Sequence, residues 1–193
     1  MNYKKYQIIY ADPPWNFKTY SDKGKRAKFG WGAYDTMSDE DIFTMPVSNL
    51  VDDNCILFLW ATYPKLQTAF ETIKRWGFTY KTVGFTWIKQ NKSGNGIWMG
   101  LGYWTRANAE ICLLASRGNP KRINAKVEQV IISPRREHSR KPDEARERII
   151  QLVGNLPRIE LFARQKTEGW DTWGNECPCD IDLSTLKEAV NVR

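Results

Sequence analysis

Apolar runs alternate along this chain with stretches whose apolar residues recur at helical spacing. Residues 6–11 are apolar and aromatic, and residues 55–60 are continuously apolar, as in a central strand covered on both faces. The spacing of apolar residues over 64–76 predicts a helix, and Gly77 follows where a helix cap belongs. Further strands are predicted at 82–88, 109–115, 128–133 and 158–163. This alternation predicts an α/β fold.

Two more helix starts carry polar signals. Ser38 precedes three acids, which is typical of an N-cap followed by a first turn. Pro142 precedes Asp143 and Glu144 and predicts a second helix that runs to about Val153.

Length and charge narrow the class of protein. The chain has 193 residues, which fits one domain over 1–193, and a formal net charge of +7. Aromatic residues make up 13% of it, and this combination favours a partner with phosphates and stackable bases. We expect no membrane association and a cytoplasmic, intracellular location, because neither a long apolar span nor an apolar signal region is visible.

Cysteine and histidine usage argues against a metal centre. Cys177 and Cys179 form a C-x-C pair, not the C-x-x-C spacing typical of zinc sites, and His138 is the only histidine. Two glycine-containing loops, 16–33 and 89–106, mix basic and aromatic residues and are predicted to grip a substrate.

The run Asp12-Pro13-Pro14-Trp15 follows the first predicted strand and is the strongest candidate site. Strand ends at the carboxyl edge of an open α/β sheet bind ligands. Asp12 is an acceptor for an amino group, and the prolines fix the turn and leave carbonyls for which few N–H groups compete. Trp15 offers a face for stacking on a base. The alternative is a Pro-Pro loop with a surface Asp and a partly buried Trp.

The Asp12–Trp15 run resembles the catalytic motif of adenine-N6 methyltransferases, the family of the eukaryotic messenger-RNA adenosine-N6 methyltransferase catalytic subunit and its bacterial and phage relatives. Other segments resemble that family in the same order along the chain. They are Tyr34–Asp39, Leu57–Trp60, Gly118–Pro120, Lys141–Glu144, Ile159–Arg164 and Trp173–Glu176.

The resemblance implies a Rossmann-like class I methyltransferase fold, with a mostly parallel sheet, helices on both faces and a permuted motif order. It implies S-adenosylmethionine as cofactor and a catalytic set of Asp12, Pro13, Pro14 and Trp15. In that set Asp12 and the Pro13 carbonyl accept the two hydrogens of the adenine amine, and Trp15 stacks on the base.

The resemblance also implies binding residues. Cofactor contacts are expected from Asp12, Lys141, Phe162, Arg164, Asn175 and Glu176. Substrate contacts are expected from Tyr34, Trp60, Trp87 and Lys89 around the base, and from Lys25, Arg26 and the basic run 135–141 on phosphates. The alternatives are a core position for Trp60, a solvated charge for Lys141 and a simple turn residue for Asn175. Residues 165–167 replace the family's usual His-Asn pair.

The sequence leaves three functions open. The first, which we favour, is methylation of adenine N6 in DNA by a monomer or homodimer. The second is the same reaction on RNA. The third is a catalytically silent scaffold that binds nucleic acid.

Overall fold

A computed structural model describes residues 4–16, 36–100, 102, 104–137 and 140–185. Within these residues, seven strands form one sheet in the order β5-β3-β4-β2-β1-β6-β7. The strands are β1 (Tyr6–Ala11), β2 (Val51–Ala61), β3 (Thr79–Gln90), β4 (Ala109–Arg117), β5 (Val130–Pro134), β6 (Arg158–Leu161) and β7 (Asp171–Trp173). The α-helices are α2 (Asp39–Phe43), α3 (Leu66–Arg75) and α4 (Glu144–Val153), and 3₁₀ turns lie at Val47–Asn49 and Tyr63–Lys65.

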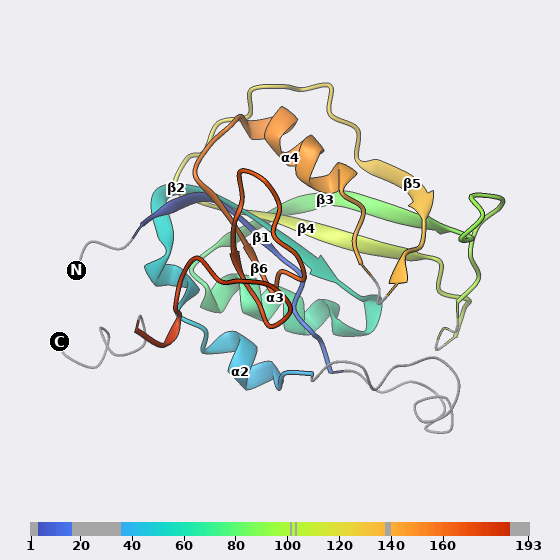
Figure 1. Ribbon diagram of the computed structural model, residues 1–193, viewed down its shortest axis with the longest axis horizontal. Coiled ribbons are helices and arrows are strands. Elements are labelled where there is room, and N and C mark those ends of the chain that lie inside the picture. Colours follow the sequence, from blue (N-terminus) through green and yellow to red (C-terminus); the bar gives the residue numbers. More distant parts are fainter. Residues whose placement is uncertain (1–3, 17–35, 101, 103, 138–139, 186–193) are drawn as a thin grey trace.

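The sheet is mostly parallel, as predicted. β1 pairs in parallel with β2 and β6, β3 with β5, and β6 with β7. Only β4 runs antiparallel to both of its neighbours, β2 and β3. The carboxyl ends of the six other strands therefore meet at the edge where β4 begins. The α/β assignment is confirmed, and helices cover both faces, with α4 on one and α2 and α3 on the other (Figure 1).

Alternation along β2 divides the core between the two faces of the sheet. Leu57 and Leu59 point into the apolar cluster that contains Ala69 and Ile73 of α3. Phe58 and Trp60 point into the opposite cluster, which contains Ile149 of α4. A continuous apolar run such as 55–60 needs both covers, because successive side chains leave opposite faces of a strand.

The predicted helix signals are confirmed. The Ser38 side chain accepts a hydrogen bond from the backbone N–H of Asp41. α3 ends at Arg75 and Gly77 follows with φ of +82°, the left-handed conformation that glycine adopts without steric cost. In the part of the chain that the structure describes, no helix is long and apolar enough to cross a membrane.

Strand predictions were right in place and less accurate at their ends. β6 stops at Leu161, two residues before the predicted end, because Phe162 has φ of +62° and leaves the extended conformation. β7 was not predicted, since its three residues are too few for a periodic pattern.

The strand order reverses between β1 and β6. β2 follows β1 in sequence and lies on one side of it in the sheet, whereas β6 lies on the other side of β1 and β7 lies beyond β6. Ligands of open α/β sheets bind outside the carboxyl ends of strands at such a reversal. In this chain those ends lead into Asp12 and Phe162.

Candidate active site

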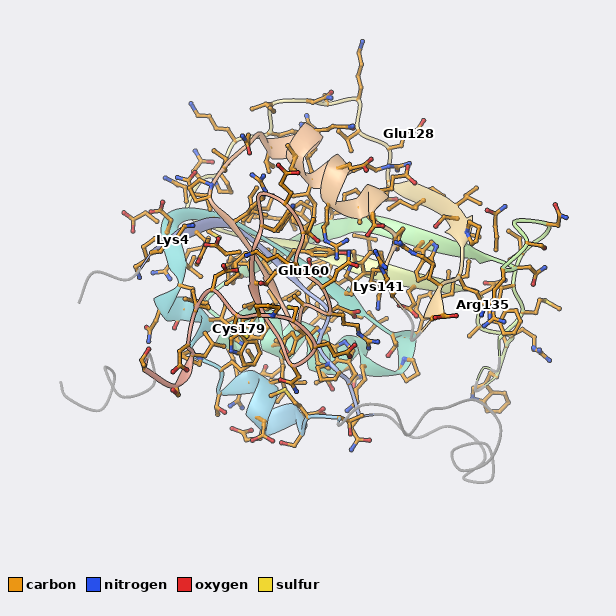
Figure 2. The ribbon with its side chains drawn as sticks, in the orientation of Figure 1. Lys4, Glu128, Arg135, Lys141, Glu160 and Cys179 are labelled. Carbon is orange, nitrogen blue, oxygen red and sulfur yellow. The ribbon has the colours of Figure 1, made fainter. Side chains whose placement is uncertain are left out.

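Asp12 and Lys141 meet at this reversal. The Lys141 ammonium donates to both Asp12 carboxylate oxygens, with Nζ at 2.7 Å from Oδ1 and 2.6 Å from Oδ2. Only 8% of the Lys141 side chain is exposed, so a solvated charge, the alternative considered for this residue, is wrong. Lys141 lies near the centre of the view, between the labelled Glu160 and Arg135 (Figure 2).

Glu110 extends this ion pair into a network. Its Oε2 lies 3.1 Å from Lys141 Nζ, and its Oε1 accepts from the Lys89 ammonium. Lys89 lies near the end of β3 and Glu110 near the start of β4. Because β4 is antiparallel, its first residues lie at the same edge of the sheet as the last residues of β3. Two cations and two carboxylates therefore alternate across the edge as Lys89, Glu110, Lys141 and Asp12.

The network keeps its members charged. Burial acts to raise the pKa of Glu110, but the Lys141 and Lys89 ammoniums outweigh burial and lower this pKa to about 2. Burial acts to lower the pKa of Lys141, and the Asp12 and Glu110 carboxylates reverse this and hold it above its ordinary value. Both groups are therefore ionised at neutral pH.

A second set of charged side chains holds the backbone at Lys141. The Arg136 guanidinium donates to the Lys141 backbone carbonyl at 2.7 Å and to Asp143 at 2.6 Å. Asp143 also accepts from Arg146, which forms a two-pronged pair with buried Glu160 at 2.7 and 2.8 Å. Because Glu160 belongs to β6, this chain of contacts ties the segment before α4 to the central sheet.

Sequence reasoning missed Glu110, Arg146 and Glu160. The available signal was an acid inside an otherwise apolar strand, Glu110 in 109–115 and Glu160 in 158–163. Buried carboxylates need a paired cation, so each of these acids implied a partner elsewhere in the chain.

The turn after β1 is held by its own hydrogen bonds. Trp15 is buried, and its Nε1 donates to the Trp60 carbonyl at 3.0 Å. The Trp15 backbone N–H donates to the Pro13 carbonyl at 2.8 Å, and the Met37 N–H donates to the Pro14 carbonyl at 3.2 Å. The prediction that few N–H groups compete for these carbonyls is wrong to that extent, although a carbonyl oxygen has a second lone pair.

Trp60 and Trp87 lie beneath the ion network. Both are buried in the core, and their Nε1 groups donate to the Tyr10 hydroxyl and the Ser133 carbonyl, respectively. The Lys141 Nζ lies 5.6 Å from the centre of the Trp60 ring, and the Lys89 Nζ lies 5.0 Å from that of Trp87. The core alternative for Trp60 is confirmed, and the role of both indoles as walls of a base pocket stays a prediction.

A basic cavity of about 560 Å³ opens beside the ends of β5, β6 and β7. Arg164 and Glu176, both predicted cofactor contacts, line it, with Arg164 Nε 3.8 Å from Glu176 Oε1. The other lining residues are Lys92, Pro134, Arg135, Arg136, Glu137, Arg140 and Gln165.

The loops that lead to this cavity have constrained backbones. Phe162 keeps its positive φ while its ring packs on Trp173 with centroids 5.5 Å apart. A Cβ on Gly174 would lie 2.1 Å from the Ala163 carbonyl oxygen, so only glycine fits there. Strained conformations of this kind cluster at functional sites. The next residue, Asn175, is exposed to solvent.

Residues 165–167, which depart from the family pattern, are tied to the loop after β7 through Lys166. Lys166 pairs with Asp180, and Asp180 accepts from the backbone N–H of Thr172 at 2.7 Å. This closes the loop that carries Asn175 and Glu176. Cys177 and Cys179 are free thiols in it. No group of three or more histidine, cysteine or acidic side chains suited to a metal ion occurs within the described ranges.

Some predicted contacts lie outside the described residues. They are Tyr34, Lys25 and Arg26, and the same holds for His138.

Glu110 gives the site a measurable pH dependence. Because its pKa is lower in the folded protein, its stabilisation is complete above its ordinary pKa of 4.5 and is lost as pH falls toward 2. We expect wild type to exceed Glu110→Gln in free energy of unfolding at pH 6.5, and the difference to narrow at pH 3.5 in urea titrations. Glu128→Gln, at a side chain that is 82% exposed, is the control. A difference that is constant with pH would contradict the ionised, paired state of Glu110.

Comparisons with known proteins point to one family. The profile of the family described as MT-A70 matches residues 6–176. The chain is 35% identical to the type II methyltransferase M.MunI of Mycoplasma sp over 96% of its own length and 84% of that protein. It is 32% identical to the N(6)-adenosine-methyltransferase MT-A70-like protein of Arabidopsis thaliana and 30% identical to the catalytic subunit METTL3 of Homo sapiens. These matches cover 88% and 89% of this chain but only 23% and 28% of the relatives.

Proposed function

Since the chain belongs to the MT-A70 family of N6-adenine methyltransferases, we propose that it transfers a methyl group from S-adenosylmethionine to the N6 amine of adenine in DNA. The observation that carries this proposal is the placement of Asp12. Its carboxylate lies at the strand-order reversal, and its partner Lys141 is buried and charged.

The reaction needs an acceptor that improves a poor nucleophile. The lone pair of the adenine amine is delocalised into the ring, and hydrogen bonds from its two N–H groups to acceptors favour a pyramidal nitrogen. A carboxylate offers about four acceptor positions, so the two contacts from Lys141 leave room for an amine hydrogen on Asp12. The Pro13 carbonyl, which already accepts from Trp15, takes the second hydrogen with its remaining lone pair.

Asp12 also acts through its charge. As nitrogen bonds to the methyl carbon, the methyl–sulfur bond breaks and the neutral thioether leaves. Nitrogen is then positive until one of its N–H protons is lost to water, and a fixed carboxylate in a partly buried site stabilises that charge. Lys141 and Glu110 hold the carboxylate in one orientation before the substrate arrives, so little reorganisation accompanies the reaction.

The cavity has room for the cofactor, and two of its six expected contacts, Arg164 and Glu176, line it. S-adenosylmethionine supplies a methyl group activated by its sulfonium. The cavity volume of about 560 Å³ is within the range of small-molecule sites, roughly 300–1,000 Å³. Arg164 and Glu176 would contact the ribose and adenosine, Asn175 would add a ribose contact, and Phe162 would line the adenosine side. Lys141, expected to pair with the carboxylate of the methionine part, does not line the cavity, and its ammonium already contacts Asp12 and Glu110.

Trp15 is proposed to stack one face of its ring on the base, while its Nε1 holds it in the fold through the Trp60 carbonyl. We expect Trp15→Phe to keep the ring face and lose the Nε1 bond to the Trp60 carbonyl, with a rise in KM and near-normal kcat. Trp15→Ala should raise KM and lower kcat, because base stacking is worth roughly 1–3 kcal/mol. Steady-state kinetics with thermal unfolding in parallel checks this. If Trp15→Ala folds and its kcat and KM match those of wild type, the stacking role is wrong.

DNA is the proposed substrate because the match to M.MunI runs through most of both chains. RNA is the second candidate, supported by relatives whose names specify adenosine, the ribonucleoside. Each of those relatives is far longer than the region it shares with this chain. Their names are therefore weaker support for the substrate of this chain than the match to M.MunI.

A competition assay separates the two substrates. The protein is incubated with methyl-labelled S-adenosylmethionine and equal amounts of DNA and RNA of the same sequence, and each is recovered and counted. We expect the label in DNA. Label confined to RNA would overturn the choice of substrate, and binding of both nucleic acids without transfer would favour a silent scaffold.

A further inference from the structure

The loop that joins β3 to β4 presents a large aromatic side chain to solvent beside the site. Trp104 is 93% exposed, far more than is usual for a tryptophan. It lies six residues before Glu110, so it can stand at most roughly 20 Å along the chain from the ion network. A nucleotide next to a target base bound at the ion network would lie within that reach.

Hydrogen bonds join described residues of this loop on both sides of Trp104. The Arg106 guanidinium donates to the carbonyls of Met99 and Gly100, both at 2.8 Å, and the Gly100 N–H donates to the Ala107 carbonyl at 2.8 Å. A Cβ on Gly102 would lie 1.7 Å from the Thr105 carbonyl oxygen, so the turn there requires glycine. These contacts constrain the described residues of the loop that carries Trp104.

The surroundings of this loop are basic. The Arg135 guanidinium stacks on Trp98 of the same loop with its central carbon 3.7 Å from the ring centre. Arg135 and Lys92 also line the cavity, so the loop and the cavity share one cationic surface. Arg135 lies on the side of the molecule toward which the β3–β4 loop projects (Figure 2). Positive charge beside an exposed aromatic ring is the combination that binds single strands of nucleic acid.

We propose that Trp104 stacks on a nucleobase next to the target adenine, while Arg135 and Lys92 hold the phosphates of the same strand. This rests on the proposed function, because it takes the target to be adenine in a nucleic acid. Methylation of a base in a duplex requires its removal from the stack. When the target adenine leaves the stack, its neighbouring base loses a stacking partner, and the ring of Trp104 replaces part of that contact.

Binding of a labelled strand tests the role of Trp104 without any methyl transfer. The probe is a fluorescein-labelled oligothymidine with one central adenine, and anisotropy gives its Kd. We expect Trp104→Ala to weaken binding roughly 5- to 150-fold and Trp104→Phe to restore most of it. Tyr80→Ala is the matched control, because Tyr80 is 39% exposed and lies near the start of β3, at the opposite edge of the sheet.

A second probe with abasic positions on both sides of the adenine makes the test specific. Wild type should bind it as weakly as Trp104→Ala binds the intact strand, and the substitution should add no further loss. Equal affinity of Trp104→Ala and wild type for the intact strand would overturn the proposal. So would a change from dimer to monomer in sedimentation with unchanged affinity, since Trp104 would then contact a second copy of this chain.

The two proposals fail in different ways. A protein whose strand affinity depends on Trp104 but which transfers no methyl group would refute the proposed function alone. A Trp104→Ala variant that methylates and binds like wild type would refute the stacking role alone.

Discussion

Replacement of Asp12 by alanine is expected to abolish methyl transfer while binding of S-adenosylmethionine is only weakened. Alanine removes the acceptor for the amine and the negative charge that stabilises the developing cation. Asp12→Asn keeps the shape and one acceptor oxygen but loses the charge, and we expect kcat to fall by at least about 10²- to 10³-fold. Single-turnover transfer of a labelled methyl group gives the rate, and calorimetry gives cofactor affinity.

Asp53→Asn is the matched control for this experiment. Asp53 is exposed and lies near the start of β2, at the sheet edge opposite the site. Its variant should transfer at the wild-type rate. Near-normal turnover of Asp12→Asn or Asp12→Ala would show that the amine is not bound by this carboxylate.

Lys141→Met is expected to have the largest effect on stability. It removes the cation that pairs with both Asp12 and Glu110, whose side chains are 23% and 10% exposed. Loss of one partner of a buried ion pair costs about 3–5 kcal/mol, because a buried charge is left unpaired. We expect a drop of that order in the free energy of unfolding, measured by urea titration at pH 7, together with loss of activity.

A double substitution separates stability from catalysis. Asp12→Asn in the Lys141→Met background removes the carboxylate that is left without its cation, whereas Glu110 keeps its pair with Lys89, so part of the lost stability should return. Activity should not return, because the carboxylate that binds the amine is absent. If Lys141→Met lowers stability by less than about 1 kcal/mol, or if the second substitution restores none of the lost stability, Lys141 does not hold Asp12 as described.

The sequence predicted the strand and helix that flank this site better than the contacts between its side chains. The strand before Asp12 and the helix after Lys141 follow from local patterns, so both ends of the ion pair could be placed at strand and helix boundaries. Their contact could not, because 129 residues separate them and only the sheet order brings them together. The family resemblance identified both residues as important but associated Lys141 with the cofactor, not with Asp12.

Buried charges and irregular backbone were the hardest features to predict. Glu110 and Glu160 lie in strands whose apolar neighbours dominate the pattern, and their partners come from other elements. The early end of β6 depends on the positive φ of Phe162, a conformation that no preference of phenylalanine suggests. Trp60 was expected at the base pocket, with a core position as the alternative, and the structure buries it in the core.

The central claim is that the carboxylate of Asp12 directs methylation to the N6 amine of adenine. Its most direct test is digestion of DNA to nucleosides after incubation with wild type or Asp12→Asn and labelled S-adenosylmethionine, followed by chromatography against standards. The account predicts label in N6-methyldeoxyadenosine with wild type and almost none with Asp12→Asn. Label in a methylated cytosine or in a ring nitrogen of adenine, or equal label with both proteins, would contradict it.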